Sequence, residues 1–183
     1  TALHESEARF ANAFEFAAVG VGLVGPDGYW IKVNRALCDM LGYSEAELLA
    51  AHFNDITHPE DRDLCRDLDL RLQRGELDSF QVEKRYLHKL GRVIWAHLSV
   101  SQIRATSGQP LYEVCQVQDI TAQKSAENER DMLFELSPDM LCVAYIDGRF
   151  KQVNPAWTRT LGWSTTELLD MSYLDLVHPA DLP

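Results

Sequence analysis

The sequence lacks an excess of positive charge, because 17 lysine and arginine residues stand against 28 acidic ones and leave a formal net charge of −11. No Lys/Arg cluster offsets phosphate repulsion, so we predict no nucleic-acid partner. The chain also lacks an apolar run near the roughly 20 residues that cross a bilayer. The longest run is residues 17–25, and no signal-peptide pattern precedes it. We therefore expect a cytoplasmic segment without membrane contact.

Cysteine pairs and catalytic motifs are also missing. Cys38, Cys65, Cys115 and Cys142 form no C-x-x-C pair, and three of them lie in apolar segments. That distribution favours buried, reduced thiols over a metal site or a disulfide framework. There is no glycine-rich phosphate loop, no H-E-x-x-H and no G-x-S-x-G motif. The segment is predicted to have no catalytic residue of its own.

What the sequence does contain is an internal repeat. When residues 14–63 are aligned with residues 134–183, 17 of the 50 positions are identical, and repetition on this scale sets the architecture. With 46% apolar and 25% charged residues, the 183-residue chain is typical of one to two globular domains. Because the sequence begins at Thr1 rather than Met and stops abruptly at Pro183, we expect an excerpt of a longer polypeptide.

The repeated positions predict the same local structure in both copies. Asp27 and Gly28 lie between apolar stretches, as do their counterparts 120 residues later, and this pattern predicts a tight hairpin. Asn34 is placed to cap a short helix, and Gly42 to end it in a left-handed conformation. Asn154, the counterpart of Asn34, should cap in the same way, since a proline suited to the first helical position follows it.

Two further repeated motifs predict helix starts. Ser44 and Glu47 form the S-x-x-E pattern of a capping box, so a second short helix should begin there. The motif His58-Pro59-x-Asp61 opens a third helix, with Pro59 in its first turn and the Asp61 carboxylate placed to suit the helix dipole. His58 is interpreted as a helix-start residue rather than a ligand.

The third helix is predicted to run from Pro59 to about Arg74. Its acid-rich segment from Glu60 to Asp69 is interpreted as a solvated face. Three strands follow, in which apolar and polar residues alternate. Together these elements predict an α+β domain of about 110 residues, with a five-stranded antiparallel sheet and helices on one face. The apolar residues expected to turn the third helix toward the sheet are Leu64, Cys65, Leu68 and Leu72.

Two more helices are predicted outside this domain. Leu3, Phe10 and Ala17 recur every seven residues. This short, incomplete heptad pattern fits a lone helix that folds back on its own domain, which its length favours, or a helix that pairs with its copy in a dimer. Residues 121–136 contain no Gly or Pro and many helix formers, so they predict a mostly solvated linker helix.

The order of these motifs resembles the PAS sensory domain family. A DG pair, then V-N-x-A-x-x-x-x-L-G-[YW]-S-x-x-E-L and H-P-x-D, resembles its N-terminal half, while Trp95 and the motif Asp119-Ile120-Thr121 resemble its C-terminal half. The resemblance covers essentially the whole chain. It implies that the last strand pairs with the first in the middle of the sheet, and that a complete domain precedes half of a second one.

These expectations divide the chain into four parts: an N-terminal amphipathic helix (1–14), a PAS domain (15–121), a linker or signalling helix (122–136) and the N-terminal half of a second PAS domain (137–183). A two-stranded remnant is marginal in water. The last part is therefore expected to be poorly stabilised unless it packs on the first copy or on another chain.

The resemblance also implies a function. It assigns Asp119, Ile120 and Thr121 to signal relay between the sheet and the outgoing helix, and simple helix capping is compatible with that role. The chain would be a sensory module of a cytoplasmic signalling protein that responds to a small ligand or partner and acts on a downstream histidine kinase or diguanylate cyclase in the same polypeptide. The alternative is a ligand-free dimerisation module. We expect a homodimer through the N-terminal helix and the outer sheet face, which includes Trp95 and His97.

No cofactor is predicted. Flavin-binding photosensory members of the family carry an N-C-R-F-L-Q stretch whose Cys attacks the flavin, but residues 54–59 here contain no Cys, and Cys65 lies further on. Haem would need a proximal His on the third helix, which has none between Pro59 and Arg74. These departures argue against covalent flavin and haem. A non-covalent flavin or a small metabolite would leave little trace in sequence and stays open.

Overall fold

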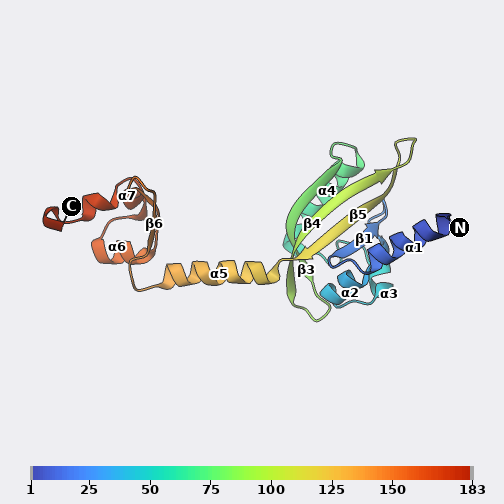
Figure 1. Cartoon of the computed structure of the whole chain (residues 1–183), viewed down its shortest axis with the longest axis horizontal. Helices are drawn as coiled ribbons and strands as arrows, with labels where there is room; N and C mark the ends of the chain where they lie inside the picture. The colour runs from blue at the N-terminus through green and yellow to red at the C-terminus, as the bar shows by residue number, and fades with distance from the viewer. Residues whose placement is uncertain (1, 182–183) are drawn as a thin grey trace. The chain divides into compact units, whose positions relative to one another are not determined.

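The computed structural model describes residues 2–181, although the side chains of residues 2–4 and 6 lie outside the described part. The predicted role of the Leu3 side chain therefore falls outside the described residues. The chain divides into two compact units, residues 1–122 and residues 123–183 (Figure 1).

The first unit is built on one antiparallel sheet with the strand order β2-β1-β5-β4-β3. β5 pairs with β1 from Gly20 opposite Val117 to Val24 opposite Glu113, so the predicted pairing of the last strand with the first is confirmed. The α+β fold with five antiparallel strands is confirmed as well (Figure 1). The elements are α1 (Ala2–Glu15), β1 (Gly20–Val24), β2 (Trp30–Val33), α2 (Arg35–Leu41), α3 (Glu45–Leu49), η1 (Pro59–Asp61), α4 (Arg62–Gln73), β3 (Ser79–Leu87), β4 (Val93–Arg104) and β5 (Pro110–Asp119).

The core lies between the sheet and the helices α2, α3 and α4. Alternation along the strands turns every second side chain inward, where it meets the apolar stripes of the helices. Burying these side chains is the main favourable contribution to folding. The helices contribute Leu37, Leu41, Leu48 and Leu72, and the sheet contributes Val24, Trp30, Tyr86, Ile94, Ala96, Leu98, Val100, Cys115 and Val117.

Local signals in the first copy form the structures predicted for them. Gly28 has φ 80°, and Gly42 ends α2 with φ 77°, a region that favours glycine. The Asn34 side-chain oxygen accepts hydrogen bonds from the backbone N–H of Leu37 at 3.0 Å and of Val21 at 2.8 Å. Its amide also donates to the carbonyls of residues 14 and 19, so this buried side chain ties α1, β1 and α2 together.

The third helix differs from the prediction on its apolar face. A 3₁₀ turn, η1, precedes α4, and Leu64 is 51% exposed rather than turned toward the sheet. Cys65 and Leu72 are buried, whereas Leu68 and Asp69 are half-buried. The interpretation of the acidic segment as wholly solvated is therefore wrong at Asp69.

Asp61 lies in the first turn after His58, as predicted, and has a further role there. Its carboxylate accepts from the Arg85 side chain at Oδ2 (Nε, 3.0 Å) and Oδ1 (Nη2, 2.6 Å), and Oδ2 accepts from the Arg85 backbone N–H at 2.7 Å. It makes no side-chain capping bond at the start of α4. The motif therefore fastens the start of α4 to β3, while His58 caps η1 by accepting from the N–H of Glu60 at 3.4 Å.

The N-terminal helix is only partly folded onto its own unit. α1 ends at Glu15, so Ala17 lies beyond it and the heptad pattern does not continue through one helix. Phe14 is buried beneath the Lys32 ammonium, which lies 4.8 Å from the ring centroid. Phe10 stays 61% exposed.

The second unit repeats the first half of this fold on a smaller scale. α5 (Thr121–Leu136), predicted as a helix, leads into β6 (Cys142–Ala144), β7 (Phe150–Val153), α6 (Pro155–Leu161), α7 (Thr165–Leu169), η2 (Tyr173–Leu176) and η3 (Pro179–Asp181). Phe150, Val153 and Leu168 form its small core.

One prediction for this unit is wrong, and another is confirmed only in part. Cys142 is exposed rather than buried, because β6 pairs with β7 alone and all three residues of β6 are exposed. Asn154 occupies the N-cap position of α6 with a proline after it, as predicted, but its side chain makes no capping bond. Instead it accepts from the N–H of Leu141 at 2.9 Å and donates to the carbonyl of Asp139 at 2.9 Å.

Candidate functional site

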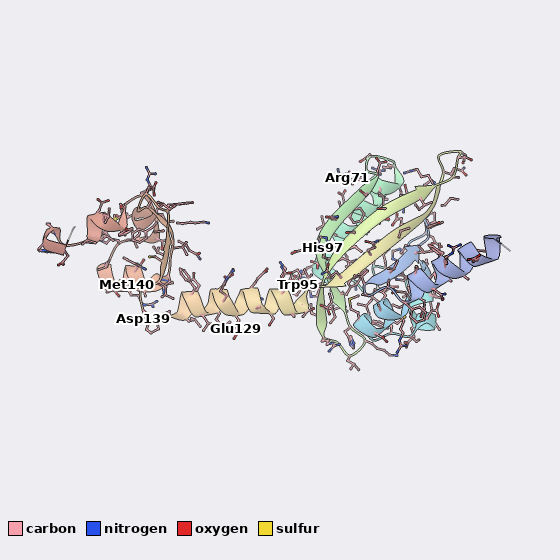
Figure 2. All side chains as sticks on the ribbon, in the orientation of Figure 1. Arg71, Trp95, His97, Glu129, Asp139 and Met140 are labelled. Atoms are coloured by element: carbon pink, nitrogen blue, oxygen red, sulfur yellow. The ribbon has the colours of Figure 1, made fainter. Side chains whose placement is uncertain are left out.

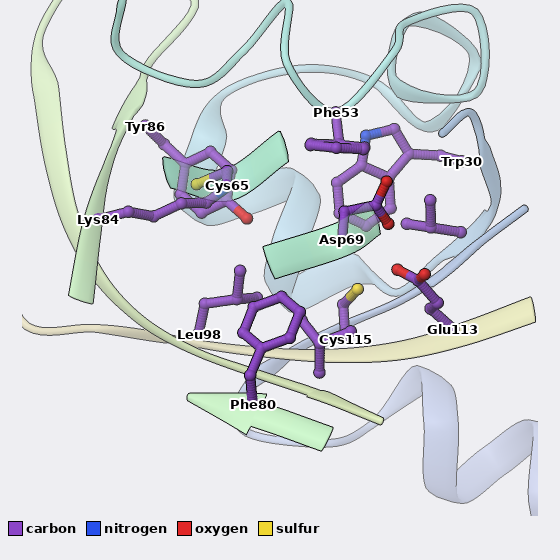
Figure 3. Close-up of a pocket in the computed structure, with 12 residues that line it drawn as sticks. Trp30, Phe53, Cys65, Asp69, Phe80, Lys84, Tyr86, Leu98, Glu113 and Cys115 are labelled. Atoms are coloured by element: carbon purple, nitrogen blue, oxygen red, sulfur yellow. The ribbon is translucent and has the colours of Figure 1, made fainter. Parts of the chain in front are cut away.

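A cavity of about 30 Å³ lies inside the first unit, between the inner face of the sheet and α4 (Figure 3). A space of this size holds one or two water molecules, or a ligand of a few atoms. Most of its wall is apolar, from side chains such as Phe53, Phe80 and Leu98. Its polar groups are few, as is usual for sites that bind small molecules.

One end of the cavity carries a buried lysine. Lys84 on β3 is 2% exposed, and its ammonium donates to Thr57 Oγ1 at 3.0 Å and lies 4.2 Å from the ring centroid of Tyr86. Burial lowers the pKa of Lys84, since the charged form loses its hydration. Lys84 was not among the predicted site residues, although strand alternation places it on the same face as Val82 and Tyr86.

The other end carries two carboxyl groups. Asp69 on α4 and Glu113 on β5 face one another there (Figure 3). Burial, together with repulsion from the neighbouring Asp69, raises the pKa of Glu113 to about 8. Cys115 lies two residues after Glu113 on the inner face of β5. Its pKa is raised to about 12, mainly by burial. At neutral pH the carboxyl pair therefore holds a proton.

Two buried polar atoms of the cavity wall lack hydrogen-bond partners among the described residues. Trp30 Nε1 and Glu113 Oε1 are both without one, in side chains that are 4% and 5% exposed. Leaving such a group unpaired costs about 1–3 kcal/mol. A fold that tolerates two of them in one cavity fits a site where a water or a ligand supplies the partner.

The predicted relay residues meet at the junction of β5 and α5. The Thr121 hydroxyl accepts from the Trp95 backbone N–H at 3.0 Å, and the Ile120 N–H donates to the Trp95 carbonyl at 2.9 Å. Asp119 Oδ1 accepts from the Thr121 N–H at 2.8 Å. The start of α5 is thus bonded to the strand β4, and Trp95 belongs to the same junction.

A second set of contacts joins this junction to the start of α4. Arg85, which holds Asp61, places its guanidinium 5.3 Å from the Trp95 ring and lies opposite Trp95 in the β3–β4 register. Figure 2 labels Trp95 and His97 near this end of the sheet. Lys84, which lines the cavity, directly precedes Arg85 on β3. The cavity wall is therefore adjacent in sequence to the Arg85–Trp95 contact.

The remaining motif residues have structural positions away from the cavity wall. Asp27 Oδ1 accepts from the N–H of Tyr29 at 3.2 Å in the hairpin turn. Ser44 and Glu47 form the predicted capping box, and Glu47 also binds Lys89 at 2.6 Å. Pro59 occupies the first turn of η1. The structure thus brings Trp95 together with the relay residues, but it does not bring the other motif residues into one site.

No helix within 2–181 is both long and apolar enough to cross a membrane. Across the same residues, no group of three or more His, Cys, Asp or Glu side chains is arranged to hold a metal ion.

Comparison with protein families matches residues 18–122 to the family described as "PAS domain" and residues 128–182 to the one described as "PAS fold". A "Probable diguanylate cyclase DgcE" of Escherichia coli (strain K12) is 44% identical over 135 residues, 73% of this chain and 12% of the relative. The "Sensor histidine kinase TmoS" of Ectopseudomonas mendocina is 30% identical over 132 residues, 72% of this chain and 14% of the relative. The chain thus spans only a small part of the length of these relatives.

Among solved structures, a PAS domain from Colwellia psychrerythraea superposes with a TM-score of 0.59 at 20% identity. The match covers 64% of this chain and 98% of that one. At this level of identity, the likeness concerns the fold alone.

Proposed function

The chain belongs to the PAS domain family, and from that premise we propose that its first unit is a sensory module whose cavity binds a small ligand. The ligand's effect would pass through β5 and the Trp95 junction into α5. A downstream histidine kinase or diguanylate cyclase in the same polypeptide would respond, as the names of the two relatives suggest. The segment itself would contribute regulation rather than catalysis.

The observation that carries this proposal is the bonding of the junction. β5 holds Glu113 in the cavity wall and Asp119 at its own end, so a shift of the strand on ligand binding displaces the cap of α5. The hydroxyl of Thr121 and the N–H of Ile120 form hydrogen bonds that connect the start of α5 directly to the backbone of Trp95. A ligand can act through this connection only if it binds the two states with different affinity.

The test replaces Thr121 by Val in the full-length polypeptide, which removes the acceptor for the Trp95 N–H but keeps the shape. Kinase or cyclase output should change about 2- to 30-fold, the range of couplings of 0.5–2 kcal/mol. Thr106→Val, in an exposed turn, is the matched control and should leave output unchanged. Unchanged output in a folded Thr121→Val protein would refute the relay.

A cytoplasmic location is part of the same proposal. Cys65 and Cys115 are buried free thiols in the cavity wall. Such thiols suit a reducing compartment.

A second candidate function is homodimerisation, which exposed aromatic side chains support. Phe10 and Phe16, near the end of α1, are 61% and 78% exposed, and large exposed apolar groups commonly mark interaction surfaces. A dimer through α1 and the outer sheet face would bury them. Analytical ultracentrifugation should then give a dimer that Phe10→Ala and Phe16→Ala together convert to a monomer, whereas a wild-type monomer would refute this candidate.

A further inference from the structure

The acidic end of the cavity contains a buried acceptor without a described partner. Glu113 Oε1 is unpartnered among the described residues, and so is Oε1 of Gln102, which lies directly opposite Glu113 in the β4–β5 register. Asp69 lies beside Glu113 in the cavity wall, and one of its oxygens accepts from Gln73 Nε2 at 3.1 Å. The buried carboxyl pair thus keeps one unpartnered acceptor, Glu113 Oε1.

The buried cation of the cavity does not neutralise this end. Lys84 is bonded to Thr57 and lies over Tyr86, and the ionisable groups that influence its pKa are Cys65, Cys115 and Asp61. Figure 3 places Lys84 beside Cys65 and Tyr86, at the opposite side of the cavity from the two carboxyl groups. Lys84 therefore does not neutralise the negative charge of the carboxyl pair, and Glu113 Oε1 stays without a described donor.

We propose that the Asp69–Glu113 end of the cavity binds the ammonium group of a small aliphatic primary amine. This inference rests on the proposed function, because it takes the cavity as the ligand site. An ammonium group supplies three donors and one positive charge in a compact volume. The apolar wall at Phe80, Leu98 and Val100 would take a short hydrocarbon chain, and the cavity volume of about 30 Å³ limits it to a few carbon atoms.

The proton of the carboxyl pair gives this binding a pH signature. Around Glu113, the cavity wall contains Asp69 from α4, Cys115 from β5 and Trp30 from β2, and Gln102 of β4 lies opposite Glu113 in the strand register. Of these, Asp69 and Glu113 share the proton that an ammonium group would displace into solvent. The affinity for the amine should therefore rise with pH up to about 8, where the pair loses its proton unaided.

The experiment measures the melting temperature of the full chain with ethylammonium, ethanol or acetate, at matched ionic strength. These probes are close in size and differ in charge. With a ligand of three non-hydrogen atoms the dissociation constant cannot fall far below about 1 mM. At ten times that concentration, ethylammonium should raise the melting temperature of the first unit by about 3–8 °C, and ethanol and acetate should raise it less.

Variants assign the effect to the site. Glu113→Gln keeps the shape and removes the charge, so it should abolish the ethylammonium shift and its pH dependence, and Asp69→Asn should do the same if Glu113→Gln fails to fold. Asp67→Asn, on the exposed side of α4, is the matched control and should respond like wild type.

An equal or larger shift with ethanol or acetate overturns the amine inference but keeps the cavity as a ligand site. No shift with any probe also overturns it, whereas the proposed relay is judged separately by the output of Thr121→Val. An ethylammonium shift that Glu113→Gln retains places the amine elsewhere and overturns the inference too.

Discussion

The two units carry the same motifs but bury very different amounts of side chain. In the first unit β1 is flanked by β2 and β5, and the described core draws on every strand and on three helices. In the second, β6 pairs with β7 alone, and only Phe150, Val153 and Leu168 form the described core. Both units nevertheless contain a complete capping box and a left-handed glycine after the first short helix. Local motifs therefore determine turns and helix ends, while strands β3 to β5 are needed for the core.

The largest expected difference comes from a pair of equivalent leucines. Leu48 and Leu168 occupy the same repeat position and are both fully buried. Leu48→Ala should lower the free energy of unfolding of the first unit by about 2–5 kcal/mol, the usual cost of a core cavity. Leu168→Ala should unfold the second unit and leave the first transition unchanged. Urea unfolding followed by tryptophan fluorescence measures both transitions, with Trp30 reporting on the first unit and Trp157 on the second. Loss of the first transition in Leu168→Ala would contradict the independence of the units.

The buried acid gives the first unit a pH dependence that the second should lack. Because the folded-state pKa of Glu113 is raised from 4.5 to about 8, its contribution to stability is fully present below pH 4.5 and is lost as pH rises through 8. Glu113→Gln should therefore be more stable than wild type at pH 9, by on the order of 2–4 kcal/mol. Denaturation at pH 5, 7 and 9 checks this, and parallel pH profiles for wild type and variant would count against a buried protonated Glu113.

Substituting the aspartate of the H-P-x-D motif should have a smaller effect on stability than the changes above, and the effect should be larger in the first unit than in the second. Asp61 binds Arg85 with both carboxylate oxygens, whereas Asp181 makes no ion pair within residues 2–181. Asp61→Asn should cost about 1–3 kcal/mol in the first unit, and Asp181→Asn close to nothing. The Arg85 partner lowers the pKa of Asp61, so the difference between Asp61→Asn and wild type should shrink as pH falls through that pKa. Equal effects of the two substitutions would show that the ion pair contributes nothing.

The smallest expected effect is the same in both copies. Ser44→Ala and Ser164→Ala each remove a capping box of nearly identical geometry, with the glutamate N–H bond at 3.3 Å in both. Each should cost its own unit about 0.5–2 kcal/mol. Thermal unfolding of the two variants tests whether the repeats are locally equivalent, and a cost confined to one of them would show that they are not.

Much of the fold was predictable because its signals are local. The DG turns, the Asn34 cap, the capping boxes and the left-handed Gly42 depend on residues within a few positions of one another. The pairing of β5 with β1 is non-local, and it was predicted only through the family resemblance.

The candidate site was harder to predict. Strand alternation places Lys84 and Glu113 on the inner face, and helical spacing puts Asp69 four residues after Cys65. Charged residues at such positions are normally expected at the surface. Whether a charge is buried depends on neighbours brought by other elements, such as Thr57 for Lys84 and Asp69 for Glu113. No local pattern carries that information.

The central claim is that the state of the cavity reaches the start of α5. Its most direct test is an NMR titration of the backbone amides of Trp95, Ile120 and Thr121 between pH 6 and 10, in wild type and in Glu113→Gln. If β5 and the junction transmit the ionisation of Glu113, these amides should titrate with an apparent pKa of about 8 in wild type and lose that titration in the variant. Amides beside Glu113 that titrate while those of the junction stay fixed would contradict the account.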